Sequence, residues 1–152
     1  MLSVSVSIDV PDMAKGIRFY REAFGFSRIA APVPGVAVLK AGNMTITLLE
    51  KRERTKPSPG TDDVRRYGRH WTPVHLDIHV DDLRAALDKA VAAGASEEQF
   101  FENDEHGSAA FCADPFGHGF CLLERKARSA RLRSGNQKRA KKGTTGKPRK
   151  TP

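Results

Sequence analysis

The feature that most constrains the fold is a repeat, because one strand-and-helix pattern occurs twice along the chain. Apolar residues alternate with polar ones over residues 3–10, and the alternation returns over residues 74–80. A period of two is typical of a strand that buries one face. Sliding the sequence by 70 residues superposes Val4 on Val74, Ile8 on Ile78, Val10 on Val80 and Asp12 on Asp82. The pattern indicates two copies of one structural unit.

Each copy continues with a capped helix. Asp12 is suited to cap a helix whose apolar residues recur every three or four positions until Gly25. The second helix begins after Asp81 or Asp82 and ends at Gly94. Three extended stretches follow each helix, so the repeat predicts two strand–helix–three-strand modules.

The chain divides into four segments on this basis. Module one covers residues 3–50, and module two covers residues 74–124. Residues 51–73 are charged and rich in Pro and Gly, which is typical of a linker. We therefore expect one domain over residues 1–124, followed by a basic tail over residues 125–152.

Composition restricts the class of protein. A length of 152 residues suits one domain with a sizeable core. The net charge of +8 is unevenly placed, because the tail holds 12 Lys and Arg and no acid, while residues 1–124 hold 14 bases and 18 acids. We expect the tail to be disordered and to contact nucleic acid or another polyanion weakly. With no apolar run that could span a bilayer and no signal peptide, we expect a cytoplasmic protein without a membrane partner.

The stretch HLDIHV, which begins at His75, carries the most chemistry. As a strand it places His75, Asp77 and His79 on one face. The two histidines then lie about 13 Å apart, which is too far to share one metal. His75 and Asp77 form a feasible pair, in which Asp77 could act as a general base. With His106 or His118 the pair would match an iron facial triad, and a hydrogen-bonded polar wall is the other alternative.

Longer stretches resemble a known family. The runs PVHLDIHVDDLRAALDKAVAAGA and AFCADPFGHGFCLLE resemble the second half of a glyoxalase-like member of the vicinal oxygen chelate superfamily, which includes glyoxalases, bleomycin-resistance proteins and extradiol dioxygenases. The run FYREAFGF resembles the end of the first helix in that superfamily. The resemblance covers residues 3–124 and implies an α+β fold of two tandem βαβββ modules that form an incomplete, barrel-like cleft.

The resemblance also implies positions for a metal. In metal-dependent members the ligands come from the first and last strand of each module, and the matching positions here are Ser5, Thr47, His75 and Cys121. His75 is a customary ligand and Cys121 an unusual one, so a metal-free or atypical member is favoured. A divalent metal on His75 and Cys121 stays an alternative that needs a third ligand. Glu50 and Glu124 face away in regular strands.

The cysteines and the tryptophan leave further alternatives. Cys112 and Cys121 would face each other if the last hairpin turned between Phe116 and Gly117, which would allow a disulfide or a thiolate site. The alternative is that both are small core residues, reduced in the cytoplasm. Trp71 could cover an apolar ligand or hold the linker against the core.

These observations predict a small-molecule binding protein. We expect an organic ligand in the cleft between the modules, with His75 and Asp77 as catalytic residues. The remaining ligand-binding candidates are Ser5, Thr47, Trp71, His79 and Cys121. The resemblance implies a lyase, isomerase or dioxygenase, or alternatively a binding or resistance protein without turnover. It also implies a homodimer, and polyanion binding through the tail is a second alternative.

Overall fold

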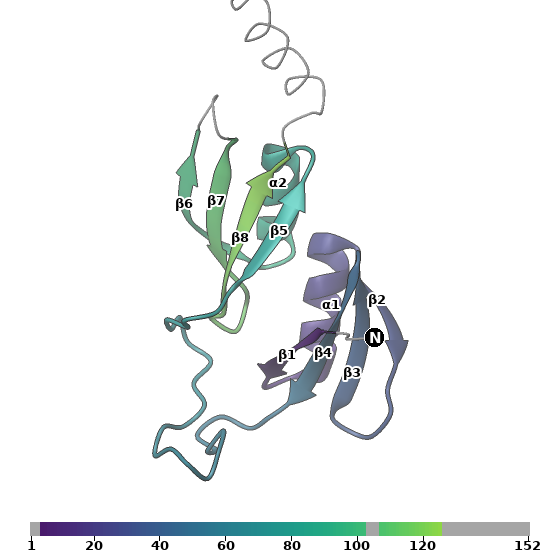
Figure 1. Cartoon of the computed structure of the whole chain (residues 1–152), viewed down its shortest axis with the longest axis vertical. Helices are drawn as coiled ribbons and strands as arrows, with labels where there is room; N and C mark the ends of the chain where they lie inside the picture. The colour runs from purple at the N-terminus through teal and green to yellow at the C-terminus, as the bar shows by residue number, and fades with distance from the viewer. Residues whose placement is uncertain (1–3, 103–106, 126–152) are drawn as a thin grey trace, which may run out of the picture.

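A computed structural model describes residues 4–102 and 107–125 of the chain. The turn expected near residues 103–106 and the tail beyond residue 125 lie outside the described residues. The described part contains two helices and eight strands, and Figure 1 labels them. Their bounds are β1 Ser5–Val10, α1 Met13–Phe24, β2 Ser27–Ala30, β3 Val36–Ala41, β4 Met44–Glu50, β5 Leu76–Val80, α2 Leu83–Ala92, β6 Ser96–Phe101, β7 Ala109–Ala113 and β8 Gly119–Glu124.

The strands form two four-stranded sheets of the same topology. The first has the order β1-β4-β3-β2 and the second β5-β8-β7-β6. In each sheet the first and last strands of the module run parallel, and the other neighbours are antiparallel. The predicted α+β fold of two βαβββ modules is confirmed, and the two sheets do not close into a barrel.

The helices begin where the sequence places their caps. The Asp12 carboxylate accepts a hydrogen bond from the Lys15 amide at 2.9 Å, and α1 ends at Gly25, whose φ of 71° favours glycine. In the second module the cap is Asp82, which accepts from the Ala85 amide at 3.0 Å. The strand expected near Gln99–Glu102 is longer and begins at Ser96, because β6 pairs with β7 from that residue onward.

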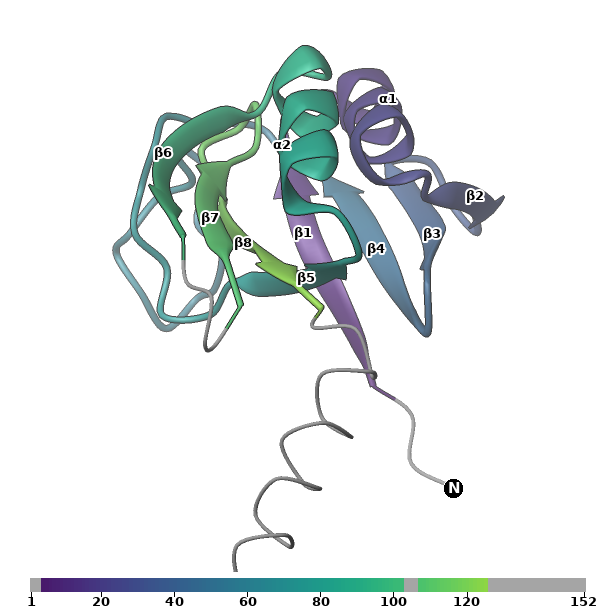
Figure 2. The ribbon, with the colours of Figure 1, turned by 90° about the horizontal axis from the view of Figure 1, so that it is seen from above.

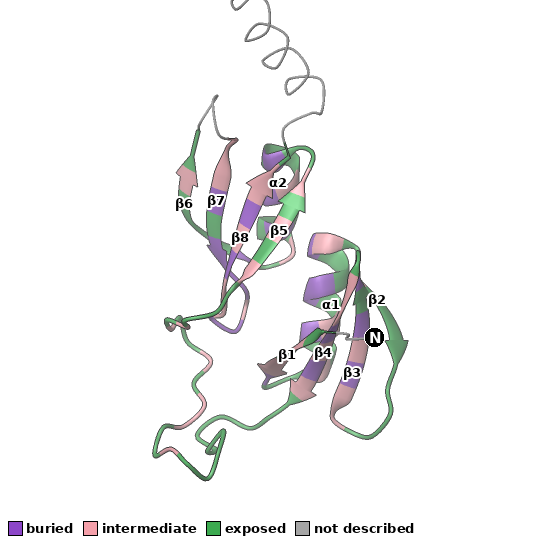
Figure 3. Cartoon of the chain, in the orientation of Figure 1, coloured by how far each residue is buried: buried purple, intermediate pink, exposed green. Residues whose placement is uncertain are grey.

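The core lies between the helices and one face of each sheet. Figure 2 shows α1 and α2 side by side, and both contact strands of their own module. Phe19 and Phe24 of α1 also contact Phe120 of β8, with ring centroids 6.5 and 5.4 Å apart. A single cluster of buried side chains therefore joins both modules. In Figure 3 the buried residues alternate with more exposed ones along the central strands. The buried residues face the helices, so the opposite face of each sheet is free of helices.

The linker is anchored to the turn between β7 and β8. Gly117 has a φ of 84°, and a Cβ atom there would overlap the Gly68 carbonyl group. The His70 amide donates to the Gly117 carbonyl at 3.4 Å. Glycine is therefore required at this position both by the backbone conformation and by the close approach of the linker. As a consequence, Arg69, His70 and Trp71 lie beside module two.

Among the described residues, no helix is both long and apolar enough to cross a membrane.

Candidate functional site

Three chemically active side chains meet on the helix-free face of module two. His75 directly precedes β5, Asp77 lies within it, and the β5–β8 register places Asp77 opposite Cys121. One ligand atom from each lies within 4.8 Å of the others. Within the described ranges, no other three His, Cys, Asp or Glu side chains meet this criterion. We refer to His75, Asp77 and Cys121 as the His–Asp–Cys cluster.

Within this cluster, His75 and Asp77 form a direct pair. The His75 Nε2 and Asp77 Oδ1 atoms are 3.2 Å apart, and both side chains are 50% exposed. Water screens a pair at this exposure, so its contribution to stability is small. A carboxylate beside an imidazole still orients the ring. The pair could therefore hold or move a proton at the surface of a binding site.

The Cys121 thiol is kept neutral. Burial raises its pKa to about 11, and the charge of Asp77 and a hydrogen bond to that carboxylate act in the same direction. Burial likewise raises the pKa of Cys112 to about 12. Because a thiol of such pKa is almost fully protonated at neutral pH, Cys121 is a poor nucleophile by itself. A bound cation would be needed to hold it as a thiolate.

The cluster lines a hollow of about 360 Å³, which we call the cluster hollow. Trp71 of the linker and Phe111 of β7 supply apolar surface, and their residues are 80% and 41% exposed. Arg69 and Glu98 line another side as an ion pair, with Arg69 Nη2 donating to Glu98 Oε2 at 2.9 Å. This bond raises the pKa of Arg69 and lowers that of Glu98. Sequence reasoning missed the pair, because linker and β6 residues meet only after folding.

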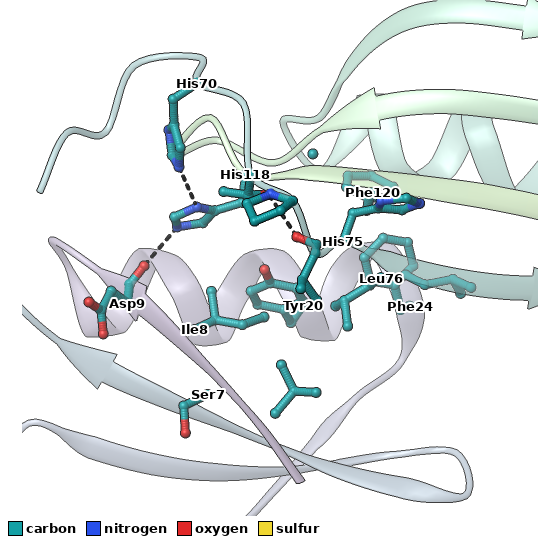
Figure 4. Close-up of a pocket in the computed structure, with 16 residues that line it drawn as sticks. Ser7, Ile8, Asp9, Tyr20, Phe24, His70, His75, Leu76, His118 and Phe120 are labelled. Atoms are coloured by element: carbon teal, nitrogen blue, oxygen red, sulfur yellow. Dashed lines mark hydrogen bonds between the residues drawn. The ribbon is translucent and has the colours of Figure 1, made fainter. Parts of the chain in front are cut away.

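A second cavity, about 410 Å³ in volume, lies on the other side of β5, and we call it the inter-module pocket. Figure 4 shows apolar side chains of β1, α1 and β5 around it, with His70 and His118 at one end. His118 Nε2 lies 2.8 Å from the Asp9 carbonyl oxygen, and His118 Nδ1 lies 3.3 Å from His70 Nε2. His75 borders both the pocket and the cluster hollow.

The other predicted ligand-binding residues lie in different places. Trp71 lines the cluster hollow with His75. His79 lines another groove near α2, which Asp77 also borders and His75 does not. Ser5 and Thr47 belong to β1 and β4 of module one, and they line neither of the two cavities that His75 borders. The structure thus brings His75, Asp77, Cys121 and Trp71 together, whereas roles for Ser5, Thr47 and His79 stay predictions.

The hairpin register separates the two cysteines. Cys121 is opposite Phe111 and Cys112 is opposite Phe120, so the cysteines occupy adjacent rungs and point to opposite faces. The expectation that they could face each other is wrong, because the register is shifted by one residue from a hairpin centred between Phe116 and Gly117. Both are free thiols, and Cys112 is the buried one.

The iron-triad alternative has less support than the sequence suggested. Both ring nitrogens of His118 are engaged by Asp9 and His70, and His118 is not part of the His–Asp–Cys cluster. His106 lies outside the described residues. Glu50 accepts a hydrogen bond from the Met13 amide at 3.2 Å, so it caps the first turn of α1.

Comparison with known proteins identifies the family. The model of the glyoxalase-like domain matches residues 5–123. The chain belongs to this family. The glyoxalase-like domain has the vicinal oxygen chelate fold that the sequence predicts. No curated protein matches the chain.

Solved structures share the fold at low sequence identity. A fosfomycin resistance protein, FosX, from Listeria monocytogenes is 15% identical, with a TM-score of 0.63 over 83% of this chain and 96% of that chain. A glyoxalase-related enzyme from Fulvimarina pelagi is 19% identical, with a TM-score of 0.63 over 82% and 89%. Lactoylglutathione lyase from Agrobacterium tumefaciens is 16% identical, with a TM-score of 0.57 over 82% and 92%.

The His–Asp–Cys cluster has a donor set that fits a divalent metal such as Zn²⁺. Imidazole nitrogen, carboxylate oxygen and thiolate sulfur are all zinc ligands, and three protein ligands leave a fourth position for water or substrate. If a metal binds, Asp77 would be the third ligand, because one of its carboxylate oxygens lies within 4.8 Å of the ligand atoms of His75 and Cys121. The high pKa of Cys121, about 11, opposes metal binding, because a metal must displace the thiol proton before sulfur can act as a ligand.

Proposed function

We infer that the glyoxalase-like domain binds a small organic molecule in the cluster hollow. The observation that carries this proposal is the meeting of His75, Asp77 and Cys121 in a hollow with aromatic walls. Small-molecule sites combine apolar surface with a few convergent polar groups, and the volume of about 360 Å³ suits such a ligand. Trp71 and Phe111 would contact its apolar part.

The polar groups suggest what the ligand carries. His75 and Asp77 together could accept a proton from a ligand hydroxyl or an acidic C–H group, or donate one to it. A bound ligand would displace water from the half-exposed His75–Asp77 pair. The attraction within the pair and its hydrogen bonds to the ligand would then be stronger, because water screens the pair in the free protein. Proton transfer of this kind is compatible with a lyase or an isomerase, whereas a dioxygenase would also need O₂ and a redox-active metal. A binding or resistance protein without turnover is the alternative.

A metal would change the role of the cluster. If Zn²⁺ is bound, His75, Asp77 and Cys121 would hold it, and the metal would polarise a ligand oxygen at the open position. The two forms of the proposal differ in one measurable property. A metal centre binds one equivalent of Co²⁺ or Zn²⁺ and gives a thiolate-to-cobalt absorption band, whereas a metal-free site does neither.

The test is a thermal-shift screen of small hydroxy and carbonyl compounds with and without divalent metals. Compounds that bind should raise the melting temperature of the wild-type protein. In His75→Ala this rise should fall at least threefold, while His79→Ala, altered in a different groove, should keep it. Product analysis then separates an enzyme from a binding protein. Equal ligand shifts in wild type and His75→Ala would overturn the proposed site.

We also propose a homodimer. The helix-free face of module two carries partly exposed aromatic side chains at Trp71, Phe101 and Phe111. The ring centroids of Phe101 and Phe111 are 5.0 Å apart. A second copy could cover this surface with its own module one, which would bring Ser5 and Thr47 towards the ligand. Light scattering coupled to size exclusion should then give twice the chain mass of 16.7 kDa. A Trp71→Ala, Phe111→Ser variant should be monomeric, and a monomeric wild type would contradict the proposal.

Polyanion binding by the tail is a separate proposal, supported by its 12 Lys and Arg without an acid. Removal of residues 125–152 should abolish retention on a heparin column at low salt. Retention of the truncated chain at the same salt concentration would show that the tail is not responsible.

A further inference from the structure

We propose that the inter-module pocket is a second binding site, which takes a small apolar organic acid with its carboxylate beside His70 and His118. The pocket is distinct from the cluster hollow, because it lies on the helix side of β5 and is lined by β1 and α1. Figure 4 shows the space between Ile8, Tyr20, Phe24 and Leu76, with the histidines above it. The class of ligand follows from two properties of its lining.

The first property is the proton balance of the histidine pair. His70 Nδ1 and His118 Nε2 each lie 2.8 Å from a carbonyl oxygen, those of Gly68 and Asp9. A carbonyl oxygen accepts and does not donate, so both nitrogens carry a hydrogen. The remaining nitrogens, His70 Nε2 and His118 Nδ1, face each other at 3.3 Å. If both rings were neutral, each of these two nitrogens would present a lone pair, and neither could donate a hydrogen bond. A hydrogen bond between them therefore requires one additional proton, which the two nitrogens share.

The shared proton gives one end of the pocket a positive charge. The carboxylates nearest the pair already have partners. Asp9 is paired with Arg65 at 2.6 Å, and Asp114 accepts from the Tyr20 hydroxyl and from the amides of Phe116 and His118.

The other ionisable groups near the pair are Tyr67, Arg69 and His75. The Tyr67 ring lies edge-on to His118 at 6.2 Å, with its hydroxyl donating to the Lys51 carbonyl, and Arg69 is paired with Glu98. His75 lines the pocket and is paired with Asp77. The histidine pair therefore has no carboxylate of its own among the described residues, and a ligand carboxylate would supply the missing anion.

The second property is the apolar remainder of the pocket. Ile8, Phe24, Leu76 and Ile78 are core-facing residues that stay only half-buried, because the two modules do not close over them. An apolar ligand body would remove this surface from water, which is favourable by about 25 cal/mol per Å². The volume of about 410 Å³ lies at the lower end of the range for small organic ligands. A fused-ring or short-chain acid fits both properties.

The test compares 1-naphthoate with its neutral amide, 1-naphthamide, which has nearly the same shape. Titration calorimetry on the full chain at pH 6.5 should give at least tenfold tighter binding of naphthoate. Equal affinities for acid and amide would overturn the proposal.

Two variants assign the charge to the pair. His70→Gln keeps a polar side chain in the linker and should reduce the preference for naphthoate to less than threefold. Arg21→Gln removes a cation from an exposed position on α1, outside the pocket, and should leave the preference unchanged. If His70→Gln kept the tenfold preference, the histidine pair would not be the recognition element.

The position of the ligand is checked by NMR. Naphthoate should shift methyl resonances of Ile8, Leu76 and Ile78, and it should leave Leu123 in the cluster hollow unchanged. Shifts confined to Leu123 would place the acid in the cluster hollow and overturn the second site. This outcome would leave the proposed function intact, because that function depends on His75, Asp77 and Cys121.

Discussion

The helix-free faces of the two modules share a backbone and differ in chemistry. The repeat matches Ser5, Ser7 and Thr47 of module one with the His–Asp–Cys cluster of module two. The register is also the same, because Ser7 lies opposite Thr47 as Asp77 lies opposite Cys121. Module one therefore presents neutral hydroxyl groups where the cluster has an imidazole, a carboxylate and a thiol. The two modules therefore share one scaffold, whereas the imidazole, carboxylate and thiol groups of the cluster lie on module two.

The hairpins that end the two sheets differ in a related way. The β3–β4 turn at Gly42 and Asn43 is exposed, and a Cβ atom at Gly42 would meet open space. The β7–β8 turn is longer, buries Asp114, and is in contact with the linker through Gly117. The β7–β8 turn of module two therefore positions the linker residues that line both cavities. Among the described residues, module one has no turn with this role.

The largest expected effect tests this difference between turns. Gly117→Ala should destabilise the fold by about 3 kcal/mol, because the residue has a positive φ and its new Cβ would overlap the Gly68 carbonyl. Gly42→Ala, with a φ of 60° and open space, should cost only about 1 kcal/mol. Urea denaturation of both variants measures the contrast. Equal losses would mean that the linker is not held by the turn.

A slightly smaller effect is expected at Asp114. Asp114→Ala should cost about 2 kcal/mol and lower the melting temperature by several degrees, because three donors lose their buried acceptor. It should also lower the pKa of Tyr20, which burial and the nearby Asp114 carboxylate raise well above its usual value. Calorimetry and ultraviolet titration give the two readings. Asn43→Ala in the other turn is the matched control, with a change below about 0.5 kcal/mol.

The two helix-free faces are contrasted directly by paired substitutions. His75→Ala should weaken binding of any ligand found in the screen about tenfold, and Ser5→Ala, its counterpart, should change the affinity less than twofold in a monomer. Calorimetric dissociation constants decide between them. If Ser5→Ala proved as damaging as His75→Ala, both modules would contribute to the site, as expected if a partner's module one covers the cluster hollow.

The smallest effect concerns the reactivity of Cys121. Its pKa of about 11 leaves roughly one thiolate in 10⁴ at pH 7, so iodoacetamide labelling should be slow and should rise about tenfold per pH unit until the pH approaches 11. Asp77→Asn removes a charge that raises this pKa and should speed labelling about threefold. Mass spectrometry distinguishes Cys121 from buried Cys112. The assigned environment of Cys121 would be contradicted if Cys112 were labelled faster, or if the labelling rate of Cys121 did not rise with pH.

Much of the fold was predictable from local signals. Strand alternation, the caps at Asp12 and Asp82 and the glycine stop at Gly25 depend on residues close in sequence, and the structure confirms them. The position of His75 beside the first strand of module two was also predictable, because the repeat placed it there, although β5 itself begins at Leu76. The hairpin centre was not, since the turn from Asp114 to His118 is set by a buried carboxylate that accepts from Tyr20, far along the chain.

The sequence by itself therefore predicted two modules, the order of their helices and strands along the chain, and a strand face with His75, Asp77 and His79. Only the tertiary structure decided which of these groups act together. It brought Cys121 to Asp77 through a parallel strand pairing, paired Arg69 with Glu98, and aligned His70 with His118. The physical reason is the distance along the sequence over which each effect acts. Strand alternation and helix capping depend on residues a few positions apart. A site requires contacts between distant segments, and their spacing in the sequence does not indicate which of them meet.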